Sequence, residues 1–152
     1  MESAVLLGGA NSPIVSNGEA DVLVSFEPLE TLRILTKCNN KTLVITNAQP
    51  LPPFTVAVGQ GKYQPVDEIL DKVKKKVGKV VTLNGNDLAE KAGNVLSLNM
   101  VMLGALIGSG ATAVTEKVMK DIIAGSTKKA FLESNLKAFD LGKETAQKMM
   151  KG

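Results

Sequence analysis

Few side chains of this sequence have a capacity for chemistry, and carboxylates are the most prominent of them. Glu27 stands where the apolar run 22–26 ends and Pro28 begins, while Glu19 and Asp21 flank the other end of that run. Open α/β sheets bind ligands where strands give way to helices, so Glu27 is a candidate site residue. The structural alternative is a helix-start acid for Glu27 and turn or cap duty for the other two.

Two asparagines and the one cysteine are weaker candidates. Asn94 and Asn99 lie around a strongly apolar stretch. If they are buried, each amide needs a hydrogen-bond partner, because an unpaired buried polar group costs about 1–3 kcal/mol. Such residues are more often structural cross-links than ligands, and both interpretations stay open here. We interpret Cys38, with only Lys37 and Lys41 as basic neighbours, as an inert thiol.

The glycine-rich segments that could bind a phosphate are incomplete. Gly59-Gln60-Gly61 resembles the start of a dinucleotide fingerprint, but the third glycine is absent and Pro65 follows. The segment 108–110 has similar spacing but follows an expected helix instead of a strand. No Gly-Lys-Ser or Gly-Lys-Thr of a Walker loop occurs. Plain glycine turns are therefore favoured, and we expect this chain to bind no cofactor itself.

The missing residue types exclude whole classes of function. The 152 residues include no histidine and one cysteine. Histidine triads, histidine-ligated metals, zinc ribbons and iron–sulfur clusters are excluded, since each needs ligands that the sequence lacks. A single thiol also cannot form an internal disulfide, which favours a reducing, cytoplasmic setting. The chain is expected to need a partner for any demanding chemistry.

Charge and hydropathy predict neither a nucleic-acid nor a membrane partner. The net charge is +3, and the dense run of Lys72, Lys74, Lys75 and Lys76 comes with only 3% aromatic residues. We interpret that run as a solvated helix end. The apolar stretch 95–107 is shorter than the about 20 residues that span a bilayer. The sequence also opens without the basic region of a signal peptide.

Hydrophobic spacing predicts strands and helices in alternation. Short apolar runs predict strands at 4–7, 22–26, 42–46 and 79–83, and an edge strand at 54–58, with 22–26 covered on both faces. Helices are predicted from Pro28, from Pro65, from Asn86 through Ala92, over 95–107, from Ala113 to a stop at Gly125-Ser126, and over 128–150. This order predicts a single domain over 1–152, of layered α/β class with a largely parallel sheet.

Several phrases line up with one protein family. They are 11–15 (NSPIV), 18–30 (GEADVLVSFEPLE), 92–94 (AGN), 99–105 (NMVMLGA) and 131–142 (FLESNLKAFDLG). Through them the chain resembles the gamma subunit of 2-oxoacid:ferredoxin oxidoreductases. The same domain is the beta subunit of indolepyruvate:ferredoxin oxidoreductase and recurs in single-chain pyruvate:ferredoxin oxidoreductases. The segment 135–142 leans towards the indolepyruvate or 2-oxoglutarate type.

The resemblance implies a three-layer α/β/α Rossmann-like domain with a largely parallel or mixed sheet and a long C-terminal helix. It implies a subunit of an enzyme that oxidatively decarboxylates a 2-oxoacid to an acyl-CoA, with electrons passing to ferredoxin. In that family, thiamine diphosphate, magnesium and iron–sulfur clusters belong to partner chains. No catalytic residue is therefore carried over, and Glu27, Asn94 and Asn99 are expected to face the partner or the substrate channel.

The chain departs from the family pattern at its start. Family members open with a strand–turn–helix unit that contains Gly-Gln-Gly. From the usual size of a βαβ unit, about forty residues of this kind are absent here. Their absence is expected to expose a sheet edge, which predicts a tight homo- or hetero-oligomer or strand exchange. Two alternatives stay open: a free-standing α/β small-ligand or nucleotide-binding module, and an assembly protein without activity.

Overall fold

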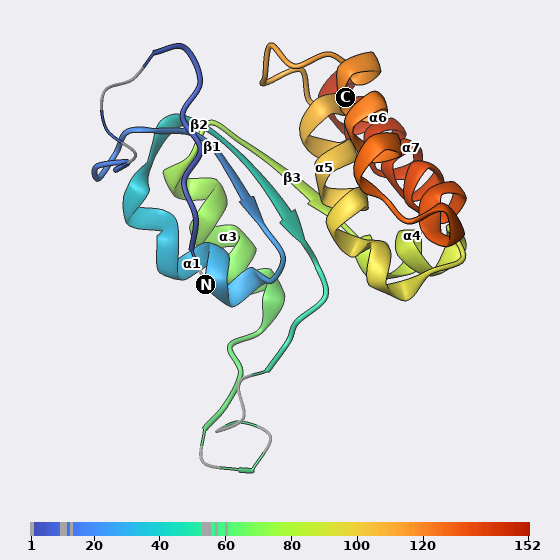
Figure 1. Cartoon of the computed structure of the whole chain (residues 1–152). Helices are drawn as coiled ribbons and strands as arrows, with labels where there is room; N and C mark the ends of the chain where they lie inside the picture. The colour runs from blue at the N-terminus through green and yellow to red at the C-terminus, as the bar shows by residue number, and fades with distance from the viewer. Residues whose placement is uncertain (1, 10–11, 13, 53–55, 57, 60) are drawn as a thin grey trace.

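Three parallel strands form a sheet between two layers of helices (Figure 1). The computed structural model describes residues 2–9, 12, 14–52, 56, 58, 59 and 61–152. The strands lie in the order β1 (Ala20–Ser25), β2 (Cys38–Asn47) and β3 (Lys79–Leu83). In the register, Leu23 lies beside Val44 and Ile45 beside Val81. The predicted α/β class with a parallel sheet is confirmed.

Helices cover both faces of the sheet, as parallel sheets require. Helices α1 and α3 lie on one face, while α5 and α7 cover the other (Figure 1). A 3-10 turn follows α1 and another precedes α5. In chain order the helical elements are α1 (Pro28–Ile34), η1 (Leu35–Lys37), α3 (Val66–Lys76), α4 (Gly85–Lys91), η2 (Val95–Ser97), α5 (Leu98–Gly108), α6 (Glu116–Ser126) and α7 (Lys129–Lys151).

Alternating strand residues build two separate apolar cores, because successive side chains of a strand point to opposite faces. Val44 of β2 packs with Ile69 and Val73 of α3. Its neighbour Ile45 packs on the opposite face with the core of α5 and α7, together with Val81 of β3. The sheet is thus buried between the two helix layers that the family resemblance implies.

Glycines let α5 and α7 pack at backbone contact. A Cβ atom at Gly104 would lie 1.9 Å from the carbonyl oxygen of Phe139, and one at Gly142 would lie 2.0 Å from that of Val101. Any larger residue at either position would push the helices apart. The segments 99–105 and 131–142, which carry part of the family resemblance, therefore have a packing role.

Most predicted elements are confirmed within a few residues. The strand at 79–83 and the helices beginning near Pro28 and Pro65 are present, and α7 occupies nearly the predicted 128–150. The apolar helix begins at Leu98 because Asn94 first caps the turn η2. Helix α6 begins at Glu116, three residues after the predicted Ala113, and it ends at Ser126, within the predicted stop at Gly125-Ser126.

Two strand predictions are wrong in part. Residues 4–7 form no strand, and Val5 is 82% exposed, because no strand of the described sheet pairs with them. β1 is only half-buried over most of its length, since it lies at an edge of that sheet instead of in its middle. The strand predicted at 54–58 falls largely outside the described residues.

No helix in the described part of the chain is long and apolar enough to cross a membrane.

Candidate functional site

Glu27 joins the end of β1 to the start of α1. Its backbone is extended, and its Oε2 accepts a hydrogen bond of 2.9 Å from the N–H of Glu30, which makes it the N-cap of α1. Pro28 follows as the first helical residue, where its missing N–H costs nothing. The Glu-Pro pair thus ends the strand and begins the helix, and it leaves the Glu27 side chain buried.

The other carboxylate oxygen of Glu27 holds the connection between β2 and α3. Oε1 accepts hydrogen bonds from the hydroxyl of Tyr63 and from the N–H of Leu51, the latter at 3.4 Å. Burial raises the pKa of Tyr63, and the hydrogen bond to the Glu27 carboxylate raises it further. Tyr63 therefore stays protonated. Leu51 and Tyr63, from the two ends of the connection, thus bond to the same carboxylate oxygen.

Buried hydroxyl groups hold the backbone of Glu27 in place. The Ser25 Oγ donates to the Glu27 carbonyl over 2.9 Å, and the Thr31 Oγ1 donates to the same oxygen over 3.1 Å. The hydroxyls of Thr31 and Thr46 lie 2.9 Å apart, which links α1 to β2. Both threonines are fully buried, so these bonds replace the ones that water would make.

Asn47 cross-links the ends of all three strands. Its Nδ2 donates to the Phe26 carbonyl at 3.1 Å and to Asn86 Oδ1 at 2.8 Å, while its Oδ1 accepts from the N–H of Gly85 at 2.9 Å. Asn47 is 1% exposed. Leu98 of α5 packs directly on Gly85, where a Cβ atom would approach its Cδ1 to 2.6 Å. The polar network thus extends to the start of α5.

We call the carboxyl ends of β1, β2 and β3, with the residues that follow them, the carboxyl edge. It includes Phe26, Glu27, Asn47, Leu51 and Gly85. Its buried polar groups bond to one another, and the two carboxylate oxygens of Glu27 accept three hydrogen bonds from described residues, so Glu27 serves as a cap and cross-link. The helix-start interpretation of Glu27 is therefore the one the geometry bears out. On the surface of this edge, Phe26 is 49% exposed and Leu51 76% exposed. An exposed apolar surface of this kind can bind the apolar surface of another protein.

Asn94 and Asn99 share no hydrogen bond with Glu27 or its partners among the described residues. Asn94 is half-buried, and its Oδ1 caps η2 by accepting from the N–H of Leu96 at 3.1 Å. It lines a shallow depression with Phe131 at the start of α7. Asn99 is exposed, and its Oδ1 contacts the N–H of Met100. Asn99 is therefore no buried cross-link, because it lies on the outer side of the first turn of α5.

Sequence reasoning missed the partners that hold this region together. Tyr63, Thr31, Thr46 and Asn47 were not identified from the sequence. Only Thr46 and Asn47 carry a usable signal, because they are polar residues at the end of a strand. A second missed pair joins η2 to α7, where the hydroxyl of Ser97 lies 2.6 Å from Asn135 Oδ1. The Ser97 side chain is buried and the phrase 131–142 contains Asn135, so that phrase positions the depression beside Asn94.

The remaining candidates have local roles. Glu19 accepts a hydrogen bond of 3.2 Å from the N–H of Ser16, which confirms its turn duty. Asp21 is an exposed residue within β1, so turn or cap duty is wrong for it. Gly110 follows the C-cap of α5 and has a φ of +71°, a value that favours glycine. Gln60 of the other glycine segment lies outside the described residues. Within the ranges that the structure describes, no three histidine, cysteine, aspartate or glutamate side chains gather as metal ligands.

The fold and the site define a layered α/β protein whose carboxyl edge exposes apolar side chains on a fixed backbone. The chain matches the family described as pyruvate ferredoxin/flavodoxin oxidoreductase over residues 3–145, and it belongs to that family. It is 34% identical over 142 residues to indolepyruvate oxidoreductase subunit IorB of Archaeoglobus fulgidus, covering 93% of this chain and 71% of that protein. It is 37% identical over 138 residues to the IorB of Pyrococcus horikoshii, covering 90% and 68%.

Two solved structures share the fold. The gamma subunit of keto/oxoacid ferredoxin oxidoreductase from Geobacter sulfurreducens PCA has a TM-score of 0.60 at 19% identity, covering 88% of this chain and 68% of that one. The 2-oxoglutarate:ferredoxin oxidoreductase from Magnetococcus marinus, with 2-oxoglutarate, coenzyme A and succinyl-CoA bound, has a TM-score of 0.62 at 22% identity, covering 93% and 23%. They confirm the three-layer fold that the sequence resemblance implied.

Proposed function

We propose that this chain is the small, gamma-type subunit of a 2-oxoacid:ferredoxin oxidoreductase in the cytoplasm. The observation that carries the proposal is the family match over residues 3–145, with IorB relatives of which the chain covers about two thirds or more. The complete complex would oxidatively decarboxylate a 2-oxoacid to an acyl-CoA and pass the electrons to ferredoxin. The chain would act as one domain, 1–152, without a catalytic residue of its own.

The cofactors of such a complex fit partner chains better than this one. An iron–sulfur cluster needs several cysteine thiolates, whereas the one thiol here, Cys38, is 1% exposed within the apolar core beside α3. We therefore assign the clusters, thiamine diphosphate and magnesium to partner subunits. Coenzyme A would bind in the assembled complex, and the reacting groups would all lie on the partner subunits or the cofactors.

The carboxyl edge is the surface that we assign to the partner. Phe26 and Leu51 would bury their exposed apolar side chains against it, while the bonds of Glu27 and Asn47 keep the backbone beneath them fixed. Burial of apolar surface drives most protein association, at roughly 25 cal/mol per Å². Asn94 and Asn99, at the turn before α5 and on its first turn, would face the same partner or the substrate channel.

Affinity purification of the tagged chain from native extract tests the proposal. We expect a larger oxidoreductase subunit containing thiamine diphosphate and iron–sulfur clusters to co-purify, together with 2-oxoacid-dependent viologen reduction. A panel that includes indolepyruvate and 2-oxoglutarate would identify the substrate. Phe26→Asp is expected to abolish co-purification, while the control Ile122→Asp, on the exposed face of α6, is expected to retain it. Oxoacid turnover by the purified chain alone would refute the proposal.

A further inference from the structure

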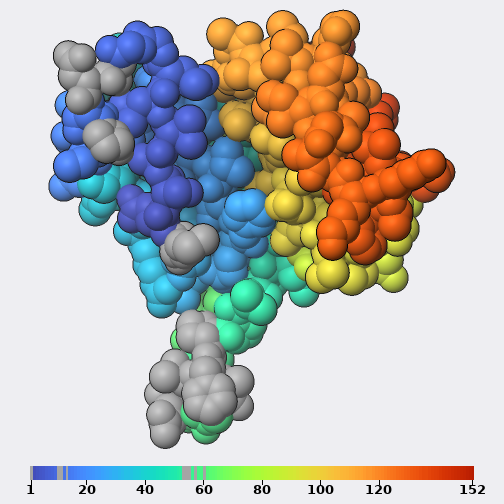
Figure 2. Space-filling view, viewed as in Figure 1, coloured from blue at the N-terminus to red at the C-terminus, as the bar shows by residue number. Residues whose placement is uncertain are grey.

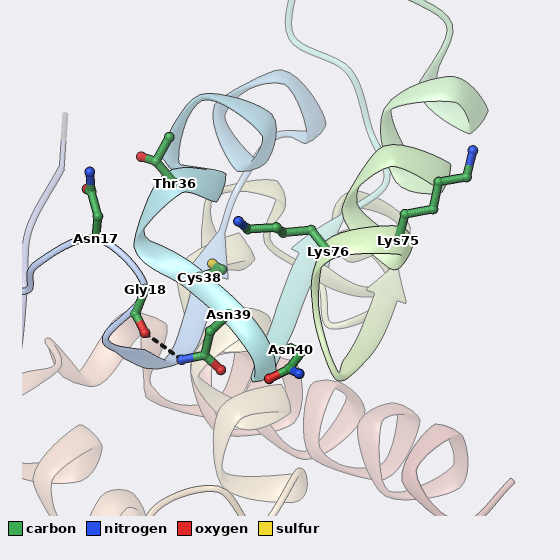
Figure 3. Close-up of a pocket in the computed structure, with 8 residues that line it drawn as sticks. All are labelled: Asn17, Gly18, Thr36, Cys38, Asn39, Asn40, Lys75 and Lys76. Carbon is green, nitrogen blue, oxygen red and sulfur yellow. Dashed lines mark hydrogen bonds between the residues drawn. The ribbon is translucent and has the colours of Figure 1, made fainter.

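A basic hollow lies at the amino ends of the strands, the opposite end of the sheet from the carboxyl edge. Figure 3 shows the residues that line it. It is an open depression of about 550 Å³, within the size range of small-ligand sites. The turn before β1, the end of η1, the start of β2 and the last turn of α3 all contribute to it. We call it the Lys76 hollow, because Lys76 reaches across it in Figure 3 while Lys75 points away.

The Lys76 ammonium is available to a ligand. Lys76 is exposed, and no ion pair within the described ranges involves it. Its charge acts into the hollow, because it lowers the pKa of the Cys38 thiol against the larger raising effect of burial. Among the described residues, no carboxylate lines the hollow, and the other lining groups are neutral, apart from Lys75. The electrostatic balance there therefore favours an anion.

The walls of the hollow are held in place by their own hydrogen bonds. Asn39 Nδ2 donates to the Gly18 carbonyl over 2.6 Å, and the N–H of Gly18 donates to the Thr36 carbonyl over 3.0 Å. Lys37 Nζ, just outside, donates to the Val15 carbonyl over 2.9 Å and so fixes the same turn. The amide of Asn40 and the hydroxyl of Thr36 remain beside the opening as hydrogen-bond donors (Figure 3).

We propose that the Lys76 hollow binds the phosphate group of a small ligand. A phosphate oxygen accepts charge-assisted hydrogen bonds from an ammonium, and neutral amide and hydroxyl donors from two other elements complete its surroundings. The hollow lies at the amino ends of the strands, away from the carboxyl edge to which we assign the partner. This binding site is therefore independent of the proposed function and would operate with or without an oxidoreductase complex.

Phosphate titration of the isotope-labelled full chain tests this site by NMR. We expect saturable shifts at the amides of Gly18, Asn39 and Asn40 with inorganic phosphate, and stronger binding of a nucleoside diphosphate if the natural ligand is a nucleotide. Lys76→Gln is expected to weaken phosphate binding about tenfold or more, since a hydrogen bond to a charged group is lost. Lys72→Gln removes the same charge from α3 outside the hollow and is expected to change binding less than twofold.

Three results would overturn the site. The first is an absence of saturable shifts with either ligand. The second is equal weakening by Lys76→Gln and Lys72→Gln, which would show general attraction to a basic helix end. The third is that chloride causes the same amide shifts as phosphate at the same ionic strength, which would show charge screening without recognition of phosphate. Iodoacetamide modification of Cys38 provides a second measurement, because a bound phosphate is expected to slow it in the parent chain and not in Lys76→Gln.

Discussion

The two ends of the sheet place their polar groups in opposite ways. At the carboxyl edge, Glu27 and Asn47 are buried and bond to the protein, while Phe26 and Leu51 present apolar surface outward. At the amino ends of the strands, Cys38 is buried while lysine side chains reach into solvent. Those exposed lysines are Lys41, Lys75, Lys76 and Lys79. Figure 2 shows one face of the molecule, on which N-terminal residues (blue) cover the left side and the C-terminal helices (orange and red) the right.

The polar groups at the two ends therefore contribute differently to the stability of the fold. Polar groups that bond internally stabilise the structure, because removing one leaves its buried partners unpaired. Exposed charges contribute little to folding, but they remain available for ligands. Substitutions of the buried polar groups at the carboxyl edge should therefore cost stability, whereas substitutions of the exposed lysines at the amino end should cost binding alone.

The largest expected effect is that of Asn47→Ala. The change leaves the Gly85 N–H and the Phe26 carbonyl without their partner at a fully buried position, so we expect a loss of about 3 kcal/mol of unfolding free energy. Urea denaturation followed by circular dichroism measures it. Asn40→Ala, the same change at the exposed amino end, should cost less than about 0.5 kcal/mol. Equal losses in the two variants would remove the distinction between the ends.

Glu27→Ala should rank second, at about 2 kcal/mol. It removes the N-cap of α1 together with the acceptor of Tyr63 and Leu51, and an N-cap alone is worth about 1 kcal/mol. The matched change Glu19→Ala removes a carboxylate that bonds one exposed N–H at the other end of β1. Its expected cost is about 0.5 kcal/mol or less. A loss for Glu19→Ala as large as that for Glu27→Ala would contradict our ranking.

Tyr63→Phe should have a smaller effect, with a recognisable pH dependence. The hydroxyl bond to Glu27 is worth about 1 kcal/mol at neutral pH. Because the folded pKa of Tyr63 is raised, the folded state keeps its proton more tightly than the unfolded chain. This contribution is complete below the unfolded pKa of about 10 and is lost as pH rises further. Denaturation between pH 8 and 11 should show a decline in the parent chain that Tyr63→Phe lacks.

Local rules predicted the elements because each one is specified by neighbouring residues. Pro28 and Pro65 begin helices, the apolar run 79–83 is a strand, and the spacing of Ile69, Leu70 and Val73 defines the buried face of α3. The prediction failed where the outcome depends on distant partners. Residues 4–7 have the composition of a strand, but a strand forms only if another lies beside it.

The site was predicted less completely than the fold for the same reason. Glu27 could be identified because the transition from strand to proline is visible in the sequence. Its bond to Tyr63 could not, because the two residues are brought together by a connection whose course no local pattern specifies. The hollow was missed because Asn17, Asn39 and Lys76 come from three separate segments, and the lysine run alone indicated a solvated helix end.

The smallest effect should come from Lys76→Gln on the thiol of Cys38. Burial raises the pKa of that thiol, whereas the Lys76 charge lowers it, so removing the charge should raise the pKa further and slow alkylation by iodoacetamide. Reaction rates measured from pH 7 to 10 follow the thiolate. Lys72→Gln should leave the rates unchanged, and both variants should keep unfolding free energies within about 0.5 kcal/mol of the parent. A stability loss for Lys76→Gln comparable to that of Asn47→Ala would mean that the amino end, too, depends on its polar groups to fold.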